Sequence, residues 1–355
     1  MINIIGNILG SSGYDVHTRN LARALGKITD VRLSIQAGPG WERLVDDKEL
    51  EMLKKLPVDN EINLIITNPI YWRLNTNAKR NFVFLVWEGD RIPKCYLEEC
   101  MNPEIDLIFV PSEHTKKAIM NTEKTQEQYE AVKDKIKIIP HGVDLDLFYP
   151  KEKPNKCIFV ANKGFRNLED RGGIQYLIKA YLEEFTDKDN AELILKINPA
   201  YGIPNLQEFI SKLSPRKENL PLINIDTQNI PYNKLVNLYN KGTVFVSPTR
   251  AESYNLPCIE AMACGLPVIT TNFGGQTDYC SNETGWIIGG ELKEVEHEIL
   301  YEGIKWLTPD IKKLREALRQ AYDDHGLVKG LGKTALITAR LNTWDKTAKK
   351  IVELI

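Results

Sequence analysis

The sequence predicts an α/β protein built on doubly wound parallel sheets, and three observations lead to this prediction. Short runs of β-branched and apolar residues recur along the chain, starting with residues 2–8. Segments with apolar residues at helical spacing, such as 14–25, separate many of these runs. Polar, glycine-bearing loops follow several of the expected strands, where open α/β sheets bind ligands. The 355 residues suffice for two domains of ordinary size.

The first domain is expected to span residues 1–149. Its first strand leads through Gly10 and Gly13 into a helix, but the spacing of these glycines differs from G-x-G-x-x-G, which argues against a dehydrogenase. Ser112 is a candidate N-cap for a later helix over 112–120. Further strands are expected at 31–35, 62–67, 82–87, 105–110 and 136–139.

The second domain is expected to span 150–341, after a polar, proline-bearing stretch at 146–154. Its strands are expected at 157–161, 192–197, 222–225, 243–246 and 267–271, with intervening helices that include 205–213 and 232–239. A glycine-bearing segment at 330–334 lacks the spacing of a phosphate loop and is interpreted as a connection between helices. A final helix over 342–355 either crosses back to the first domain or is an ordinary helix of the second.

The amino-acid composition excludes several classes of function. With 46 basic and 48 acidic residues the net charge is −2, so no overall charge attracts the chain to nucleic acid or acidic lipid. The six cysteines form no Cys-x-x-Cys pair and no ligand spacing for a metal ion, and we expect free thiols. No apolar run approaches the ~20 residues that span a bilayer. We therefore expect a cytoplasmic protein, with at most a peripheral contact to the inner face of the membrane.

The stretch 247–272 reads as strand end, polar loop, helix and second strand. Glu252 lies in the loop and Glu260, after seven intervening residues, lies one turn into the helix, so both carboxylates can face one crevice. The N–H groups at the start of the helix suit a phosphate, and the carboxylates suit sugar hydroxyls: Glu260 at a ribose and Glu252 at a hexose. The alternative is a solvated loop, with Glu260 complementing only the helix dipole.

The sequence ESYNLPCIEAMACGLPVI over 252–269 resembles the signature of the family 4 retaining glycosyltransferases. The resemblance implies the GT-B fold, with two Rossmann-like domains facing an interdomain cleft, and it implies no metal ion or other cofactor. It places Glu252 at the donor sugar and Glu260 at the ribose of the nucleotide. Other donor-binding residues that it implies are Ser253, Asn255 and Leu256. Asn255 stands where the family commonly has glycine, and asparagine tolerates a positive φ better than most residues.

The loop 162–173 matches the place where the family grips the donor diphosphate with an arginine and, about five residues later, a lysine before a glycine. Arg166 fits the first position, and Arg171 replaces the lysine with a fork suited to phosphate oxygens. The alternative is a solvated loop. Gly13 matches a family glycine whose loop reaches toward the donor phosphates and sugar, although a tight turn also explains it.

An acidic loop follows the strand that is expected to end at Trp87. Many family members carry a histidine there that contacts the transferred sugar, and this chain has none. Glu88 or Asp90 is the candidate to bind sugar or acceptor hydroxyls, or to activate the acceptor as a base. The alternative is that they cap a turn or pair with Arg91.

Three histidines, His17, His114 and His141, invite catalytic roles. His141 begins a His-Gly-Val-Asp element that the family uses chiefly as a turn beside the hinge, while His114 lies in a first helical turn and His17 on an early helix. For each of them a structural or acceptor-side role is favoured over chemistry.

These residues predict a hexosyltransferase that takes a UDP- or GDP-sugar as donor and a glycan, lipid-linked or small-molecule hydroxyl as acceptor, with no nucleic-acid partner. Two alternatives stay open: an epimerase of GT-B fold that acts on a nucleotide sugar, and a non-catalytic partner that binds a sugar nucleotide for another transferase.

Overall fold

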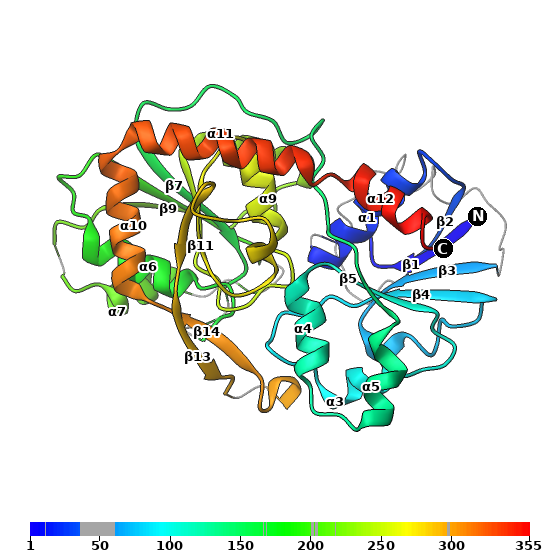
Figure 1. Cartoon of the computed structure of the whole chain (residues 1–355). Coiled ribbons are helices and arrows are strands. Elements are labelled where there is room, and N and C mark those ends of the chain that lie inside the picture. Colours follow the sequence, from blue (N-terminus) through cyan, green and yellow to red (C-terminus); the bar gives the residue numbers. More distant parts are fainter. Residues whose placement is uncertain are drawn as a thin grey trace. The chain divides into compact units, whose positions relative to one another are not determined.

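The computed structural model describes residues 1–10, 12–35, 61–165, 167, 169–199, 202, 205–216, 218–296 and 299–355. The chain divides into two compact units (Figure 1). The first unit comprises Met1–Gly142, Val295–Lys305 and Asn342–Ile355, and the second comprises Val143–Glu294 and Trp306–Leu341. The backbone therefore changes unit after Gly142, Glu294, Lys305 and Leu341.

The first unit has a parallel sheet whose six strands, within the described residues, follow the order β2-β1-β3-β4-β5-β6. The strands are β1 (Ile2–Gly6), β2 (Val31–Ile35), β3 (Ile62–Ile66), β4 (Arg80–Phe84), β5 (Leu107–Val110) and β6 (Ile136–Ile138). Its helices are α1 (Gly13–Leu25), α3 (Lys94–Cys100), α4 (Glu113–Asn121), α5 (Gln126–Lys133) and α12 (Trp344–Val352), with short 3-10 turns η1 (Pro69–Tyr71) and η5 (Ile299–Tyr301).

The second unit repeats this architecture, with six parallel strands among the described residues in the order β12-β11-β10-β7-β8-β9. They are β7 (Cys157–Lys163), β8 (Ala191–Ile197), β9 (Leu222–Asp226), β10 (Val244–Ser247), β11 (Val268–Thr271) and β12 (Gly285–Ile288). A separate pair joins β13 (Gly290–Glu294) to β14 (Lys305–Pro309).

Helices cover both faces of the second sheet. α6 (Ile174–Glu184) packs against α7 (Leu206–Leu213) and α10 (Ile311–Asp323), while α9 (Leu256–Ala263) packs against α8 (Leu235–Lys241) and α11 (His325–Leu341). The remaining turns are η3 (Tyr232–Lys234) and η4 (Gly275–Asp278). Since strand order reverses between β7 and β10, the right-handed crossovers on its two sides place helices on opposite faces. Both units thus confirm the predicted doubly wound α/β class.

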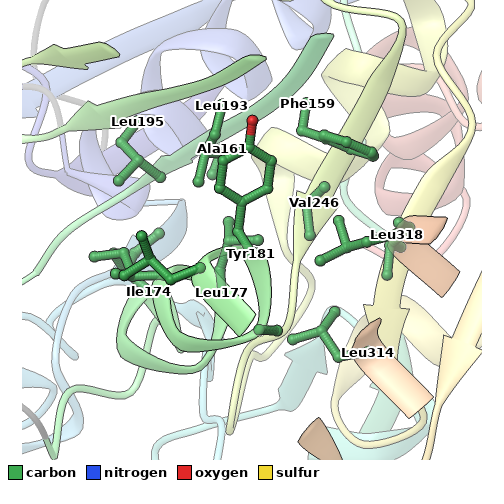
Figure 2. Close-up of a cluster of buried hydrophobic side chains, with 14 of the residues drawn as sticks. Phe159, Ala161, Ile174, Leu177, Tyr181, Leu193, Leu195, Val246, Leu314 and Leu318 are labelled. Carbon is green, nitrogen blue, oxygen red and sulfur yellow. The ribbon is translucent and has the colours of Figure 1, made fainter. Parts of the chain in front are cut away.

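The main core of the second unit lies between its sheet and the α6–α10 layer (Figure 2). The Tyr181 ring stands upright from α6 toward the strands, and its hydroxyl donates to the Leu222 carbonyl at 3.2 Å. Figure 2 shows the apolar side chains around it, from the sheet, α6 and α10: Phe159, Leu193, Leu195, Leu177, Leu314 and Leu318. Burial of this apolar layer fixes α6, and with it the place of Gly173, which precedes the helix.

The structure corrects several details of the sequence analysis. The units divide after Gly142, ahead of the stretch 146–154, and Val295–Lys305 packs with the first unit although the predicted second domain included it. Of the two expectations for the helix over 342–355, the structure confirms the crossing to the first unit, because α12 lies on α1. The segment 330–334 is interior to α11 and does not connect two helices. β4 ends at Phe84, so Trp87 lies beyond the strand.

Among the residues that the structure describes, no helix combines the length and apolar character needed to cross a lipid bilayer.

Candidate functional site

The reversal of strand order in the second unit lies between β7 and β10, which pair in parallel. Ligands of open α/β sheets bind at the carboxyl ends of the strands at such a reversal, because the two flanking loops diverge there. The loop after β7 leads to α6, and the loop after β10 carries Glu252 and leads to α9. The candidate donor residues of the second unit therefore belong to these two loops and to α9, which follows the second loop.

Glu252 is held by two cations. Its Oε1 lies 2.8 Å from the Nζ of Lys163, the last residue of β7, and its Oε2 lies 3.8 Å from a guanidinium nitrogen of Arg171. Burial by itself would raise the pKa of Glu252, but the charges of Lys163 and Arg171 outweigh it and hold the pKa below the ordinary value. Two cations against one carboxylate leave a positive balance at this edge of the sheet, which suits an anionic ligand.

Asn255 connects the same lysine to the start of α9. Its Oδ1 accepts from Lys163 Nζ at 2.7 Å, and its Nδ2 donates to Ser247 Oγ at 3.0 Å. The residue adopts φ 68° and ψ 63°, the left-handed conformation that asparagine tolerates and that explains why glycine can occupy such a position. Because its side chain is engaged with Lys163 and Ser247, it makes no capping hydrogen bond to α9. The positive end of the α9 dipole therefore lacks a side-chain cap.

The neighbours of Asn255 in this loop are largely enclosed. Ser253 is 8% exposed and Leu256, the first residue of α9, is 9% exposed. Gly275 N–H donates to the Glu252 carbonyl at 2.8 Å, which fastens the loop to the glycine pair after β11. The loop is thus shaped by the protein itself, a requirement for a site that orients a ligand.

Glu260 lies inside α9 and is 2% exposed. Its Oε1 accepts from the Tyr232 hydroxyl at 2.8 Å, and its Oε2 accepts from the Tyr239 hydroxyl at 2.7 Å. Tyr239 in turn accepts from Asn162 Nδ2 at 3.0 Å. Burial raises the pKa of Glu260 to about 7, although the two phenols and Lys163 counteract part of that rise. Each carboxylate oxygen has two lone pairs and accepts from one phenol, so acceptor capacity for a ribose hydroxyl is left. Because Glu260 is 2% exposed, a hydroxyl can reach it only if a neighbour such as Tyr232 shifts.

Arg171 is fixed from both sides by the segment after β10. Its carbonyl accepts from Arg250 N–H at 2.9 Å and from Thr249 Oγ1 at 3.1 Å, and its guanidinium donates to the Ala251 carbonyl at 3.2 Å. Gly173 has φ 77°, and a Cβ there would lie 2.0 Å from the Pro248 carbonyl oxygen, so only glycine fits. Arg166, the other arginine predicted to bind phosphate, lies outside the described residues.

The acidic loop of the first unit is engaged in specific contacts. Glu88 Oε1 accepts from the Tyr301 hydroxyl at 2.5 Å, and the Glu88 carbonyl lies 2.8 Å from His114 Nε2. Asp90 Oδ1 accepts from the Lys305 N–H at 2.7 Å. A guanidinium nitrogen of Arg91 lies 3.8 Å from a carboxylate oxygen of Glu123, so Arg91 pairs with Glu123 and not with Glu88 or Asp90.

The histidines take structural places. His17 is fully buried, with its ring 4.4 Å from Phe84, 4.2 Å from His141 and 5.7 Å from Trp344 between ring centroids. Burial, and then His141, lower the pKa of His17 well below 6.5. An enclosed neutral ring cannot contact an acceptor, which corrects the acceptor-side expectation for His17 and leaves the structural one. His114 is half-buried, and burial lowers its pKa as well.

Gly13 is the first residue of α1 and does not adopt a positive φ. Added Cβ atoms would meet no heavy atom within 4 Å, so the backbone here does not require glycine for a turn. Ser12 caps the helix through a reciprocal pair of hydrogen bonds with Asp15. Gly13 is therefore not held in a backbone conformation that only glycine adopts, and its expected place near the donor stays a prediction.

Sequence reasoning missed three residues of the site: Lys163, Tyr232 and Tyr239. Lys163 carried a signal, since a lysine directly before a glycine at a strand end is a natural phosphate or carboxylate partner. The tyrosines are seven residues apart, a spacing that puts both on one helical face. No group of three or more His, Cys, Asp and Glu side chains in the described ranges is placed to hold a metal ion.

Known proteins resemble this chain in sequence and in fold. The family described as Glycosyl transferases group 1 matches residues 151–324. A probable sucrose-phosphate synthase of Thermosipho melanesiensis is 24% identical over 64% of this chain and 48% of its own length. A D-inositol 3-phosphate glycosyltransferase of Paenarthrobacter aurescens is 28% identical over 63% of this chain and 52% of its own. The chain thus spans about half the length of these curated relatives.

Solved structures extend the likeness to the whole chain. The Anabaena HepE protein, in complex with UDP and glucose, superimposes with a TM-score of 0.69 over 99% of this chain and 98% of its own at 13% identity. At that identity the likeness concerns the fold. Residues 151–324 therefore match the model of the group 1 glycosyl transferases, and the chain that carries them has the GT-B fold.

Proposed function

We propose that the protein is a retaining glycosyltransferase that moves a hexose from a nucleoside diphosphate sugar, with UDP or GDP as the nucleotide, to a hydroxyl acceptor. The observation that carries this proposal is the arrangement of Glu252 between Lys163 and Arg171, beside the uncapped start of α9. Such an arrangement provides positive charge for a diphosphate and a carboxylate for sugar hydroxyls in one place.

The donor half of the reaction follows from these contacts. Arg171, Arg166 and the N–H groups of α9 stabilise the negative charge that develops on the departing diphosphate, which is the main demand of this chemistry on the protein. Glu252 orients the hexose through its hydroxyls. Glu260 accepts from the ribose, with Tyr232 giving way as the nucleotide enters. We propose that no metal ion or other cofactor takes part.

The acceptor half is assigned to the first unit. Glu88 is the proposed acceptor-side residue, and it either binds acceptor hydroxyls or takes the proton of the attacking one. Asp90 also has a structural role, because its carboxylate accepts a hydrogen bond from the Lys305 N–H. The role of His114 is to hold the Glu88 carbonyl, which keeps the acidic loop in place.

The relatives support the class of substrates. One is named for transfer to D-inositol 3-phosphate, one for sucrose phosphate synthesis, and a structural neighbour contains UDP and glucose. We propose a role in glycan, polysaccharide or glycolipid synthesis in the cytoplasm, with a peripheral membrane contact where the acceptor is lipid-linked.

The test is incubation of the purified protein with UDP-glucose, UDP-N-acetylglucosamine, GDP-mannose and ADP-glucose, each with D-inositol 3-phosphate or with water as acceptor. We expect the wild-type protein to release the nucleoside diphosphate from one of these donors. We expect Glu252→Gln to release none. The anomeric configuration of the product, read by NMR, tests retention. Glu88→Ala is expected to abolish transfer and to leave nucleotide binding intact. Failure to bind or consume any donor contradicts the proposal.

The same incubation separates the two alternatives. An epimerase of this fold releases an altered sugar and transfers nothing to an acceptor, so the carbohydrate product identifies it. A non-catalytic partner binds a donor tightly and turns none over. The set of Glu252, Glu260, Lys163 and Arg171 supports donor binding in both cases, so turnover decides between the transferase and the partner.

A further inference from the structure

The segment Val295–Lys305 stands out because it interrupts the second unit between β13 and β14 and packs with the first. It includes η5, which ends at Tyr301. The Tyr301 hydroxyl donates to Glu88 Oε1 at 2.5 Å, and its ring stacks on Trp87 with centroids 4.9 Å apart and planes at 22°. Tyr301 therefore contacts the acidic loop of the first unit although it lies 213 positions after Glu88 in the sequence.

Further contacts of this segment hold the rest of the acidic loop. Lys305 N–H donates to Asp90 Oδ1 at 2.7 Å, and the Asp90 N–H donates back to the Lys305 carbonyl at 3.4 Å. Ile304 is 3% exposed, and a Cβ on Gly89 would lie 2.3 Å from its Cγ2. Any side chain at Gly89 would therefore displace Ile304. The loop and the inserted segment fit each other residue by residue over Glu88, Gly89 and Asp90.

Packing alone does not explain Tyr301. A phenylalanine would make the same stack on Trp87, whereas the hydroxyl adds a hydrogen bond to a carboxylate, which is about twice as strong as one between neutral groups. The backbone of Glu88 is fixed separately, by His114 Nε2 on its carbonyl. The side chain of Glu88 thus has its own anchor, and that anchor comes from the inserted segment.

We propose that Tyr301 is a positioning residue for the transfer reaction, which fixes the Glu88 carboxylate toward the acceptor, and that Ile299–Lys305 forms part of the acceptor side of the first unit. This proposal rests on the proposed function, since it assigns the Tyr301 hydroxyl to a step in which Glu88 meets the acceptor. It assigns Tyr301 no contact with the donor nucleotide.

The experiment is a double-mutant cycle of Tyr301→Phe and Glu88→Gln in the full chain, with Tyr129→Phe on α5 as the matched control for loss of an exposed phenol. Turnover is measured with whichever donor and acceptor the panel identifies, water included. Affinity for UDP is measured by calorimetry. We expect Tyr301→Phe to lower kcat about tenfold to hundredfold, as for a lost charged hydrogen bond, with the Kd for UDP unchanged. In the Glu88→Gln background the same change is expected to do nothing further.

Three results would overturn the proposal. Turnover of Tyr301→Phe equal to that of Tyr129→Phe shows that the hydroxyl is not used. An equal loss with and without Glu88 shows that Tyr301 acts independently of that carboxylate. A weakened Kd for UDP assigns Tyr301 to the donor. A wild-type protein that binds and consumes no nucleotide sugar overturns the proposed function instead, and this proposal falls with it.

Discussion

Lys163 Nζ lies 2.8 Å from Glu252 Oε1, and the two side chains are 5% and 18% exposed. This ion pair joins the end of β7 to the loop after β10, the two elements between which the strand order reverses. A pair removed this far from water is unfavourable to break, because each charge then stays buried without its partner.

Replacement of Lys163 by methionine is expected to lower the free energy of unfolding by about 2 to 4 kcal/mol, since Glu252 keeps only the more distant Arg171. Urea denaturation at pH 7 measures it. Lys156→Met is the matched control, because the Lys156 side chain is 30% exposed in its pair with Glu192 and its loss should cost under about 1 kcal/mol. Recovery of stability in Lys163→Met/Glu252→Gln supports the explanation, and equal losses in the two single lysine variants contradict it.

Charge removal at Arg171 is expected to weaken UDP binding by about 1.5 to 3 kcal/mol, as for a lost charged hydrogen bond. Arg171→Gln keeps much of the side-chain length and removes the charge, and calorimetry with UDP measures the change. Arg166→Gln is expected to behave alike. Arg216→Gln serves as control, because the Arg216 guanidinium donates to the Leu182 and Glu183 carbonyls at the end of α6, opposite the helix start that Arg171 precedes. An unchanged affinity for Arg171→Gln would remove this residue from the donor site.

Two substitutions at Asn255 separate its backbone role from its side-chain role. Asn255→Gly loses the contacts with Lys163 and Ser247 but accepts φ 68° without strain. Asn255→Ala loses the same contacts and adds a left-handed alanine, a further cost of about 1 kcal/mol. Thermal and urea unfolding should therefore rank wild type above Gly and Gly above Ala. If the Asn255→Ala protein proved as stable as the Asn255→Gly protein, residue 255 would not adopt the left-handed conformation in solution.

The pKa of Glu260 gives the second unit a distinct pH dependence. Burial raises this pKa from 4.5 to about 7, so between these values the folded protein holds a proton that the unfolded chain has released. The contribution of Glu260 to the free energy of unfolding is therefore fully present below pH 4.5. It falls by roughly 3 kcal/mol as the pH rises to about 7. Glu260→Gln cannot ionise and should lack this slope. Urea unfolding from pH 5 to pH 8 measures the difference, and parallel curves for the two proteins would refute it.

The buried His17 gives the first unit a dependence of opposite sign. Burial lowers its pKa well below 6.5, so the unfolded chain binds a proton more readily and stability is lost as the pH falls below 6.5. His17→Leu keeps an apolar fit without a titratable ring, and relative to wild type it should gain stability between pH 7.5 and pH 5. His325→Leu, at an exposed position, is the control. No relative gain at pH 5 would place His17 in contact with water.

Much of the fold could be predicted because its signals are local. Strands such as Val31–Ile35 are short apolar runs, and helix starts such as Ser112 and Asn205 carry capping side chains, which the structure shows accepting from Thr115 and Glu208 N–H groups. The loop with Glu252 and the helix with Glu260 followed from a long motif. In each case neighbours within a few residues fix the conformation.

What could not be predicted depends on distant contacts. Lys163 meets Glu252 across 89 positions, and Tyr301 meets Glu88 across 213, distances over which composition and periodicity say nothing. The packing of Val295–Lys305 with the first unit could not be predicted either, since the pattern of its residues does not indicate which part of the chain it contacts. The burial of His17 was likewise hidden, because it depends on Trp344 and His141 from elsewhere in the chain.

The place of Trp344 bears on how the protein is made. Its ring packs beside His17 and His141, and α12 covers α1, so the first unit needs residues synthesised after all of the second unit has been translated. Until α12 has been synthesised, α1 and the rings of His17 and His141 therefore lack the cover that α12 and Trp344 give them. Such a nascent chain is a natural client for chaperones, and slowed translation of the codons for α12 would prolong that exposure.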